Sequence, residues 1–202
     1  MLQTAIIALA AYCLGSVSFA VVVSRLVGLP DPRGYGSKNP GATNVLRTGN
    51  RLAAALTLIG DAGKGALAVA LTVLYTGESA ITGFDAPLAG AMAFLGHLYP
   101  VFHGFKGGKG VATAAGVLLS LSPDLGLGTL LAFGIIVFFF RMISLASIIA
   151  AVFAVFWAWF LFGLAPITPV AGAISLLLIW RHRENILRLA HGAEPRIGEK
   201  KT

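Results

Sequence analysis

Charged residues are scarce in this chain. Only 11% of its 202 residues are Asp, Glu, Lys or Arg, whereas soluble domains carry about 25%. Hydrophobic residues make up 57%, and the mean hydropathy is +0.85. The chain therefore lacks the polar side chains that would cover a water-soluble surface, and its composition indicates an integral membrane protein.

Several catalytic and metal-binding patterns are also missing. The single cysteine, Cys13, has no partner within the chain, and neither a zinc pattern nor HExxH occurs. There is no G-x-S-x-G elbow of a serine hydrolase. No His is followed five residues later by Asp, which excludes the His-x4-Asp motif of soluble-facing glycerolipid acyltransferases. We expect neither a metal nor a cofactor.

Long apolar runs follow one another along the chain. A bilayer core of ~30 Å requires about 20 apolar residues in a helix. No Lys or Arg precedes the first run, so we interpret it as a membrane helix rather than a secretory signal. The seven runs cover residues 4–29, 52–75, 86–102, 111–122, 125–140, 143–163 and 165–180.

The fourth of these runs is short, and residues 111–140 form either two crossings or one re-entrant unit. Ser122-Pro123-Asp124 favours a turn between two crossings. We therefore predict an all-α, polytopic membrane bundle of about seven transmembrane helices. Its N-terminus is expected outside and its C-terminus in the cytoplasm, with a single domain spanning residues 1–202.

Positive charge separates between the two faces of this predicted bundle. The inside segments are residues 30–51, 103–110, 141–142 and the tail from 181. Together with Arg25 just before them, they hold every Lys and Arg except Lys64. Cytoplasmic loops are expected to be rich in Lys and Arg. We therefore assign the net charge of +7 to anionic headgroups or a phosphorylated substrate, not to nucleic acid.

The first inside segment, residues 31–47, is dense in hydrogen-bond donors. Its glycines allow backbone N–H groups to converge on an anion, and its arginines can hold a phosphate with two N–H groups. Besides Arg33, the candidate substrate contacts are Asn39, Thr43, Asn44 and Arg47. A polar connector built from turn residues would have a similar composition.

The second inside segment contains Gly107-Gly108-Lys109-Gly110 directly before an apolar run. The N-terminus of a helix binds anions, and Lys109 adds a full charge. Gly110 stands where a Walker A loop has Ser or Thr, which excludes that nucleotide signature. Lys106 and Thr113 complete the candidate contacts, and a glycine-rich turn at the membrane surface is the alternative.

The third inside segment, residues 181–194, begins at the inner end of the last helix. A basic membrane anchor explains its cations, but it explains neither Asn185 nor Glu194. Ser144, at the inner start of another predicted helix, is a further candidate contact, and N-capping or helix packing is the plainer role for such a serine.

Ionisable residues also occur inside the predicted helices. Asp61 and Lys64, three residues apart in the second run, can neutralise each other, and such pairs in membranes are functional or structural partners. His97 is the best acid–base candidate by residue type, with a structural hydrogen-bonded histidine as the alternative.

Four motifs, in order along nearly the whole chain, resemble the bacterial acyl-phosphate:glycerol-3-phosphate acyltransferases, the PlsY family. They are Gly36-Ser37-Lys38-Asn39-Pro40-Gly41-Ala42-Thr43-Asn44, Asp61-Ala62-Gly63-Lys64-Gly65, the stretch from Gly96-His97 through Lys106-Gly107-Gly108-Lys109-Gly110 to Thr113, and Arg181-His182 with Asn185, Arg188 and Glu194.

The resemblance implies transfer of an acyl chain from acyl phosphate to the 1-position hydroxyl of glycerol 3-phosphate, in phospholipid synthesis. It implies an all-helical protein of the bacterial inner membrane with a cytoplasmic site. Membrane lipids and the enzyme that forms acyl phosphate are the expected partners. By motif, Ser37 and Arg47 fall where the family has an essential Ser and Arg, residues 107–110 at its phosphate loop, and Asn185 and Glu194 at its third motif.

An acyl phosphate is already activated, so direct attack by the glycerol hydroxyl needs no covalent enzyme intermediate. We expect Lys109 and arginines to hold phosphates, and Ser37, Asn185 or backbone N–H groups to bind the carbonyl oxygen. His97, Glu194 or a substrate phosphate is the base. Lys64, Ser144 and Arg188 are further expected substrate contacts.

Two other functions share the basic clusters. A transporter of a phosphorylated solute predicts polar residues on both faces or through the midplane, and the predicted outside loops have few. A scaffold that recruits anionic lipid would leave Asn185, Glu194 and the pair formed by Asp61 and Lys64 unexplained.

Overall fold

The computed structural model describes residues 1–198, in which every regular element is a helix. The α-helices are α1 (Leu2–Gly15), α2 (Phe19–Leu26), α3 (Ala42–Val45), α4 (Arg51–Thr76), α5 (Asp85–Leu98), α6 (Val111–Leu121), α7 (Pro123–Phe140), α8 (Ile143–Phe162), α9 (Ile167–Arg181) and α10 (Arg183–Ala190), and short 3-10 turns lie at Leu46–Thr48 and Val101–His103. The predicted all-α fold is confirmed.

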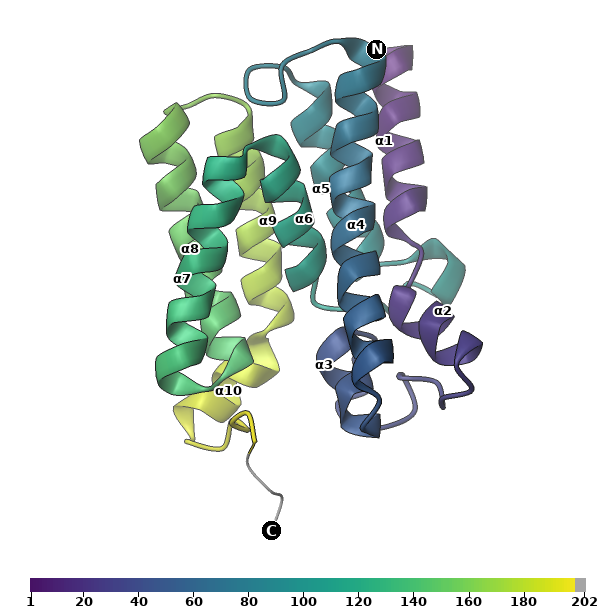
Figure 1. Ribbon diagram of the computed structural model, residues 1–202. Coiled ribbons are helices and arrows are strands. Elements are labelled where there is room, and N and C mark those ends of the chain that lie inside the picture. Colours follow the sequence, from purple (N-terminus) through teal and green to yellow (C-terminus); the bar gives the residue numbers. More distant parts are fainter. Residues whose placement is uncertain (199–202) are drawn as a thin grey trace.

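Seven of these helices, α1 and α4 to α9, run alongside one another, and the described chain begins and ends at opposite ends of the bundle (Figure 1). By length and apolar composition, α4, α7 and α8 are long enough to cross a membrane, and α1 with α2 forms a bent fourth candidate. Helices α6 and α9 are shorter and apolar. The number of crossings and their direction stay predictions.

The first apolar run differs from the single helix predicted over residues 4–29. It breaks after Gly15, and α2 is turned by 41° from α1. Two contacts stabilise the break: Ser16 Oγ accepts a hydrogen bond from Val101 N at 3.3 Å, and Lys64 Nζ donates to Val17 O at 2.6 Å. Backbone groups that leave a helix inside a bilayer need such partners, and the local pattern of this run does not reveal them.

Small residues allow the helices to pack closely. Gly116 of α6 lies so near α4 that a Cβ atom built on it would overlap the backbone of Ala62. Ala89 and Ala93 of α5 are fully buried, whereas Phe138 and Phe139 of α7 are 79% and 71% exposed. Small residues inside and large apolar residues outside are typical of a membrane bundle.

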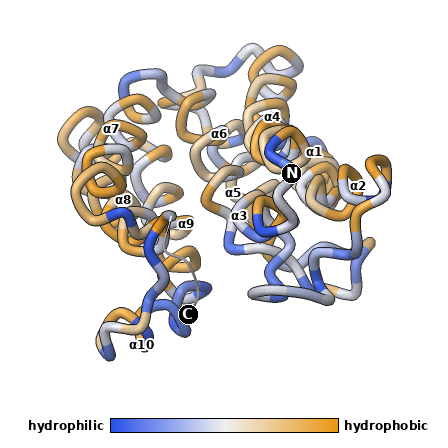
Figure 2. Tube along the Cα trace, turned by 60° about the horizontal axis from the view of Figure 1, so that its bottom comes forward, coloured by the Kyte–Doolittle hydropathy of each residue, from blue (hydrophilic) through white to orange (hydrophobic). Residues whose placement is uncertain are grey.

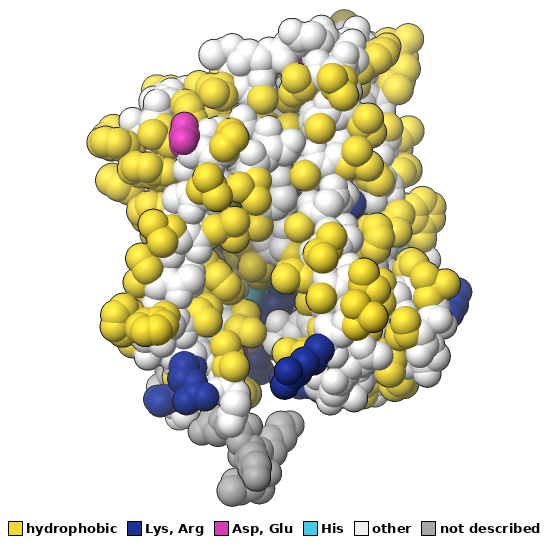
Figure 3. Space-filling model, in the orientation of Figure 1, with side chains coloured by type: hydrophobic (Ala, Val, Ile, Leu, Met, Phe, Trp, Pro, Cys, Tyr) yellow, Lys and Arg dark blue, Asp and Glu magenta, His cyan; other side chains and the backbone are white. Residues whose placement is uncertain are grey.

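Positive charge is concentrated at one end of the bundle on the face shown in Figure 3, whereas an acidic side chain lies near the opposite end. Lys and Arg side chains gather at the end where the described chain finishes, and hydrophobic side chains cover most of the remaining surface. The same face is hollowed between α4 and α7 near this end, with Lys, Arg and His side chains in its depth. We call this end of the molecule the basic end.

Candidate active site

The glycine-rich loop lies at the centre of the basic end. Gly110, with φ +85°, directly precedes α6, so the predicted junction of loop and helix N-terminus is confirmed. Gly108 N donates to His97 O at 3.1 Å, and the guanidinium of Arg181 donates to Gly107 O at 2.8 Å and to Gly108 O at 3.2 Å. The loop carbonyls are thus held, and the first N–H groups of α6 have no partner within the helix.

Lys109 connects this loop to α10. Its ammonium group donates to Asn185 Oδ1, and Asn185 Nδ2 donates to Glu194 Oε1 at 2.6 Å. Partial burial, followed by the positive charge of Arg188, lowers the pKa of Lys109. An anion that binds here would form a charge-assisted hydrogen bond with the ammonium group and stabilise its charged form.

Glu194 accepts hydrogen bonds from three side chains. Besides Asn185, Ser144 Oγ donates to Oε1 at 2.6 Å and Arg188 Nε donates to Oε2 at 2.8 Å. Burial alone would raise the pKa of Glu194, but the hydrogen bonds from Ser144, Asn185 and Arg188 outweigh it and lower the pKa. The carboxylate is therefore ionised at neutral pH, and four predicted residues from α8, α10 and the tail lie in one cluster.

The first loop approaches the same point from the other side. A Cβ atom built on Gly108 would lie 3.1 Å from Pro40 O and would overlap the imidazole of His97, so no side chain fits there. Asn44 fixes this loop: its Oδ1 accepts from Ser37 N at 3.0 Å, and its Nδ2 donates to Pro32 O at 2.7 Å. Asn44 is 2% exposed, so its amide holds the loop from within.

The remaining predicted residues differ in exposure. Ser37, Thr43, Arg47 and Lys106 are exposed at the basic end, and Asn39 is partly buried. Thr113, in the first turn of α6, is fully buried, and its hydroxyl has no hydrogen-bond partner among the described residues.

His97 and Lys64 meet at Asp61, below the glycine-rich loop. Lys64 Nζ lies 2.9 Å and His97 Nδ1 lies 3.5 Å from Asp61 Oδ1. The predicted pair of Asp61 and Lys64 is confirmed. All three side chains are at most 7% exposed, and the ammonium group of Lys64 contacts Asp61 and Val17 O. That Lys64 contacts substrate stays a prediction.

One residue of the site was interpreted from the sequence only as a membrane anchor. Arg181 holds two carbonyls of the glycine-rich loop, and its guanidinium stacks over the ring of Tyr99 at 5.7 Å from the centroid. Its position at the start of the third motif was the available signal, but basic residues at the inner ends of membrane helices are common.

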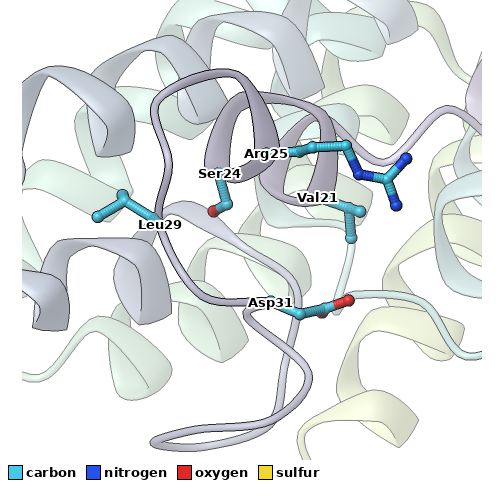
Figure 4. A pocket seen from close by; sticks show the side chains of 5 residues that line it. All are labelled: Val21, Ser24, Arg25, Leu29 and Asp31. Carbon is cyan, nitrogen blue, oxygen red and sulfur yellow. The ribbon is translucent and has the colours of Figure 1, made fainter.

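A cavity and a groove lie away from this cluster. A small cavity of about 150 Å³ is lined by Val21, Ser24, Arg25, Leu29 and Asp31 at α2 (Figure 4). An apolar groove of about 690 Å³ lies between α8 and α9, with Phe156 and Trp159 among its lining. Neither contains a predicted site residue. Viewed toward the basic end, the hydrophilic segments from α10 and from the loops near α3 face each other across the bundle (Figure 2).

Comparison with known proteins gives one consistent family. The family model described as glycerol-3-phosphate acyltransferase matches residues 5–192. The glycerol-3-phosphate acyltransferase of Paraburkholderia phymatum is 58% identical over 200 residues, covering 99% of this chain and 95% of that protein. That of Cupriavidus necator is 59% identical over 194 residues, covering 96% of each.

Two solved structures are also similar. The crystal structure of PlsY (YgiH), an integral membrane glycerol 3-phosphate acyltransferase, in its glycerol 3-phosphate form has a TM-score of 0.89 and 40% identity, covering 97% of this chain and 96% of that one. Its lysophosphatidic acid form has a TM-score of 0.87 and 39% identity, with the same coverage. Together with the matched family model and the curated relatives, these likenesses show that the chain belongs to the glycerol-3-phosphate acyltransferase family of integral membrane proteins.

Proposed function

We propose that this protein transfers an acyl chain from an acyl phosphate to the 1-position hydroxyl of glycerol 3-phosphate, giving lysophosphatidic acid and inorganic phosphate. The observation that carries the proposal is the convergence of the first loop and of helices α9 and α10 on Gly107, Gly108 and Lys109, beside a hollow flanked by apolar helices. Cations and free backbone N–H groups suit phosphates, and the apolar walls suit an acyl chain.

Lys109 and the first N–H groups of α6 are the proposed ligands of the glycerol 3-phosphate phosphate group. Lys109 contacts Asn185 on the protein side, which holds its ammonium group at the loop. A charge-assisted hydrogen bond to a phosphate oxygen is roughly twice as strong as a neutral one. Arg47, Arg188 and Lys106 supply further positive charge for the second phosphate, that of the donor, with Ser37, Asn39, Thr43 and Ser144 as additional polar contacts.

The transfer itself is proposed to be direct. The hydroxyl oxygen attacks the acyl carbonyl carbon, an ester C–O bond forms, and the C–O bond to phosphate breaks as phosphate leaves with the electron pair. In the described residues no serine hydroxyl or cysteine thiol donates a hydrogen bond to an imidazole, the arrangement that would activate a nucleophile. Positioning and charge stabilisation are left as the protein's contribution.

The hydroxyl proton needs an acceptor. Glu194 is a weak base here because it accepts three hydrogen bonds and its pKa is lowered by them. We assign it to holding Asn185 and Arg188 in place, which leaves His97 and the departing phosphate as acceptors. Asn185 and Ser37 are the proposed donors to the carbonyl oxygen.

The site is proposed to work at the cytoplasmic face of the bacterial inner membrane. The Lys and Arg residues that mark cytoplasmic loops gather at the same end as the site. Acyl phosphate, glycerol 3-phosphate and membrane lipids are the proposed partners, together with the enzyme that forms the acyl phosphate.

The identity of the acyl donor tests the proposal most directly. Purified protein in lipid nanodiscs is supplied with glycerol 3-phosphate and either palmitoyl phosphate or palmitoyl-CoA, and lysophosphatidic acid is measured by mass spectrometry. We expect product from palmitoyl phosphate alone. Product from palmitoyl-CoA alone would show that acyl phosphate is not the donor. Uptake of glycerol 3-phosphate into vesicles without any acylation would favour a transporter instead of an acyltransferase.

A further inference from the structure

Arg141 makes contacts that its place in the sequence does not explain. It stands in the two-residue turn between α7 and α8, in the left-handed backbone conformation (φ 58°) that ends α7. Its carbonyl oxygen accepts from Ile197 N at 2.7 Å, and its Nη2 donates to Ile197 O at 2.6 Å. One residue thus binds both backbone polar groups of a tail residue, which a cation that only marks the cytoplasmic face does not need to do.

The tail reaches Arg141 by reversing direction after α10. That helix ends at Ala190, Gly192 has φ +65°, and Ala193 N donates back to Arg188 O at 2.8 Å. The chain then runs antiparallel to the segment that begins α8. Two contacts fix the register of the antiparallel segments: Arg141 contacts Ile197, and Ser144 contacts Glu194. The two contacts are three residues apart along each segment.

The segment from Ala193 to Gly198 is an irregular stretch at the surface. It contains no helix, and most of its residues are exposed. Nevertheless the Glu194 side chain is only 7% exposed and is aligned with three donors. Three residues past Glu194, Arg141 binds both backbone polar groups of Ile197 and so holds the backbone on the far side of the carboxylate.

We propose that Arg141 is a positioning residue for the acyl transfer: by fastening Ile197 it holds Glu194 against Asn185, Ser144 and Arg188. The inference rests on the proposed function, in which Asn185 and Lys109 belong to the glycerol 3-phosphate site. The hydrogen bonds of Arg141 go to Ile197 and to the backbone of α7, so its effect on the site must pass through the tail and Glu194.

The kinetic test is a double-mutant cycle on the full chain in nanodiscs. We expect R141A to lower kcat/KM for glycerol 3-phosphate about tenfold, the scale of one lost hydrogen bond to a charged group. E194Q should lower it further, and R141A combined with E194Q should be no worse than E194Q alone. R25A, which removes a cation from α2 at the basic end, is the control and should match the wild type.

A second measurement does not depend on activity. Trypsin cleaves the peptide bond between Arg196 and Ile197, whose N–H group Arg141 binds. The loss of the chain beyond Arg196 from the protein is followed by mass spectrometry. We expect several-fold faster cleavage in R141A and an unchanged rate in R25A. A chain ending at Arg196, which keeps Glu194 and Arg196 but lacks Ile197, should lose activity as R141A does, whereas one ending at Gly198 should not.

These measurements distinguish a failure of the positioning role of Arg141 from a failure of the proposed acyltransferase function. Wild-type activity and wild-type cleavage in R141A would overturn the positioning role, as would losses that multiply in the double variant. If the wild type forms no lysophosphatidic acid, the proposed function fails, while faster cleavage in R141A would still support the fastening of the tail.

Discussion

Lys64→Met is the most informative single change to the buried part of the protein. The Lys64 side chain is 1% exposed, its ammonium lies 2.9 Å from Asp61 Oδ1, and it donates to Val17 O at 2.6 Å. The variant leaves a buried carboxylate without its partner and a carbonyl at the break between α1 and α2 without its donor. Breaking a buried pair costs about 3–5 kcal/mol, which for a chain of this length lowers the thermal midpoint by about 10 °C.

The assay is heating in detergent micelles, followed by tryptophan fluorescence. Asp61→Leu combined with Lys64→Met should recover more than half of the loss, because apolar residues at both positions leave no unpaired charge. Arg25→Met, which removes an exposed cation, should leave the midpoint unchanged. If Lys64→Met kept the wild-type midpoint but raised KM for glycerol 3-phosphate tenfold, Lys64 would be a substrate ligand and this reasoning would be refuted.

Three further changes test other parts of the structure. Burial, followed by the charge of Lys109, lowers the pKa of His182 from 6.5 to about 4, so the unfolded chain binds more protons below pH 6.5. Stability should therefore fall by about 1.5 kcal/mol from pH 6.5 to 5, and His182→Gln should flatten this loss in thermal scans at each pH. Ser144→Ala removes a hydrogen bond to the site carboxylate and should lower kcat/KM about tenfold, whereas Ser147→Ala, whose hydroxyl bonds within its own helix, should not. Gly116→Ala should destabilise by about 1–3 kcal/mol because its Cβ would overlap α4, whereas Gly63→Ala, with open space around it, should stabilise by about 0.5–1 kcal/mol in the same melting assay.

Much of the fold follows from local sequence patterns. Apolar runs of membrane length predict the helices, and Ser122 with Pro123 marks the turn before α7 because the serine side chain accepts from Leu125 N. The break between α1 and α2 could not be predicted in this way. It depends on Lys64 and Val101, which are far away in the sequence and act only once the bundle is formed.

The candidate site likewise contains some features that the sequence predicts and others that it does not. The motifs predicted a shared site for Lys109, Asn185 and Glu194, and these three side chains lie in hydrogen-bond contact, while their roles toward substrate stay predictions. The roles of Arg181 and Arg141 could not be predicted in this way, since both donate hydrogen bonds to backbone carbonyls. A pattern of residue types carries no signal for such contacts, and both arginines resemble ordinary cytoplasmic anchors.

Binding of glycerol 3-phosphate to Lys109→Met tests the central claim most directly. Calorimetric titration without an acyl donor is compared among the wild type, Lys109→Met and the control Arg183→Ala, which changes a cation on α10. The account predicts a dissociation constant at least about tenfold higher for Lys109→Met, the loss of one hydrogen bond to a charged group, and no change for Arg183→Ala. Equal affinity in Lys109→Met and the wild type would contradict a phosphate site at the glycine-rich loop.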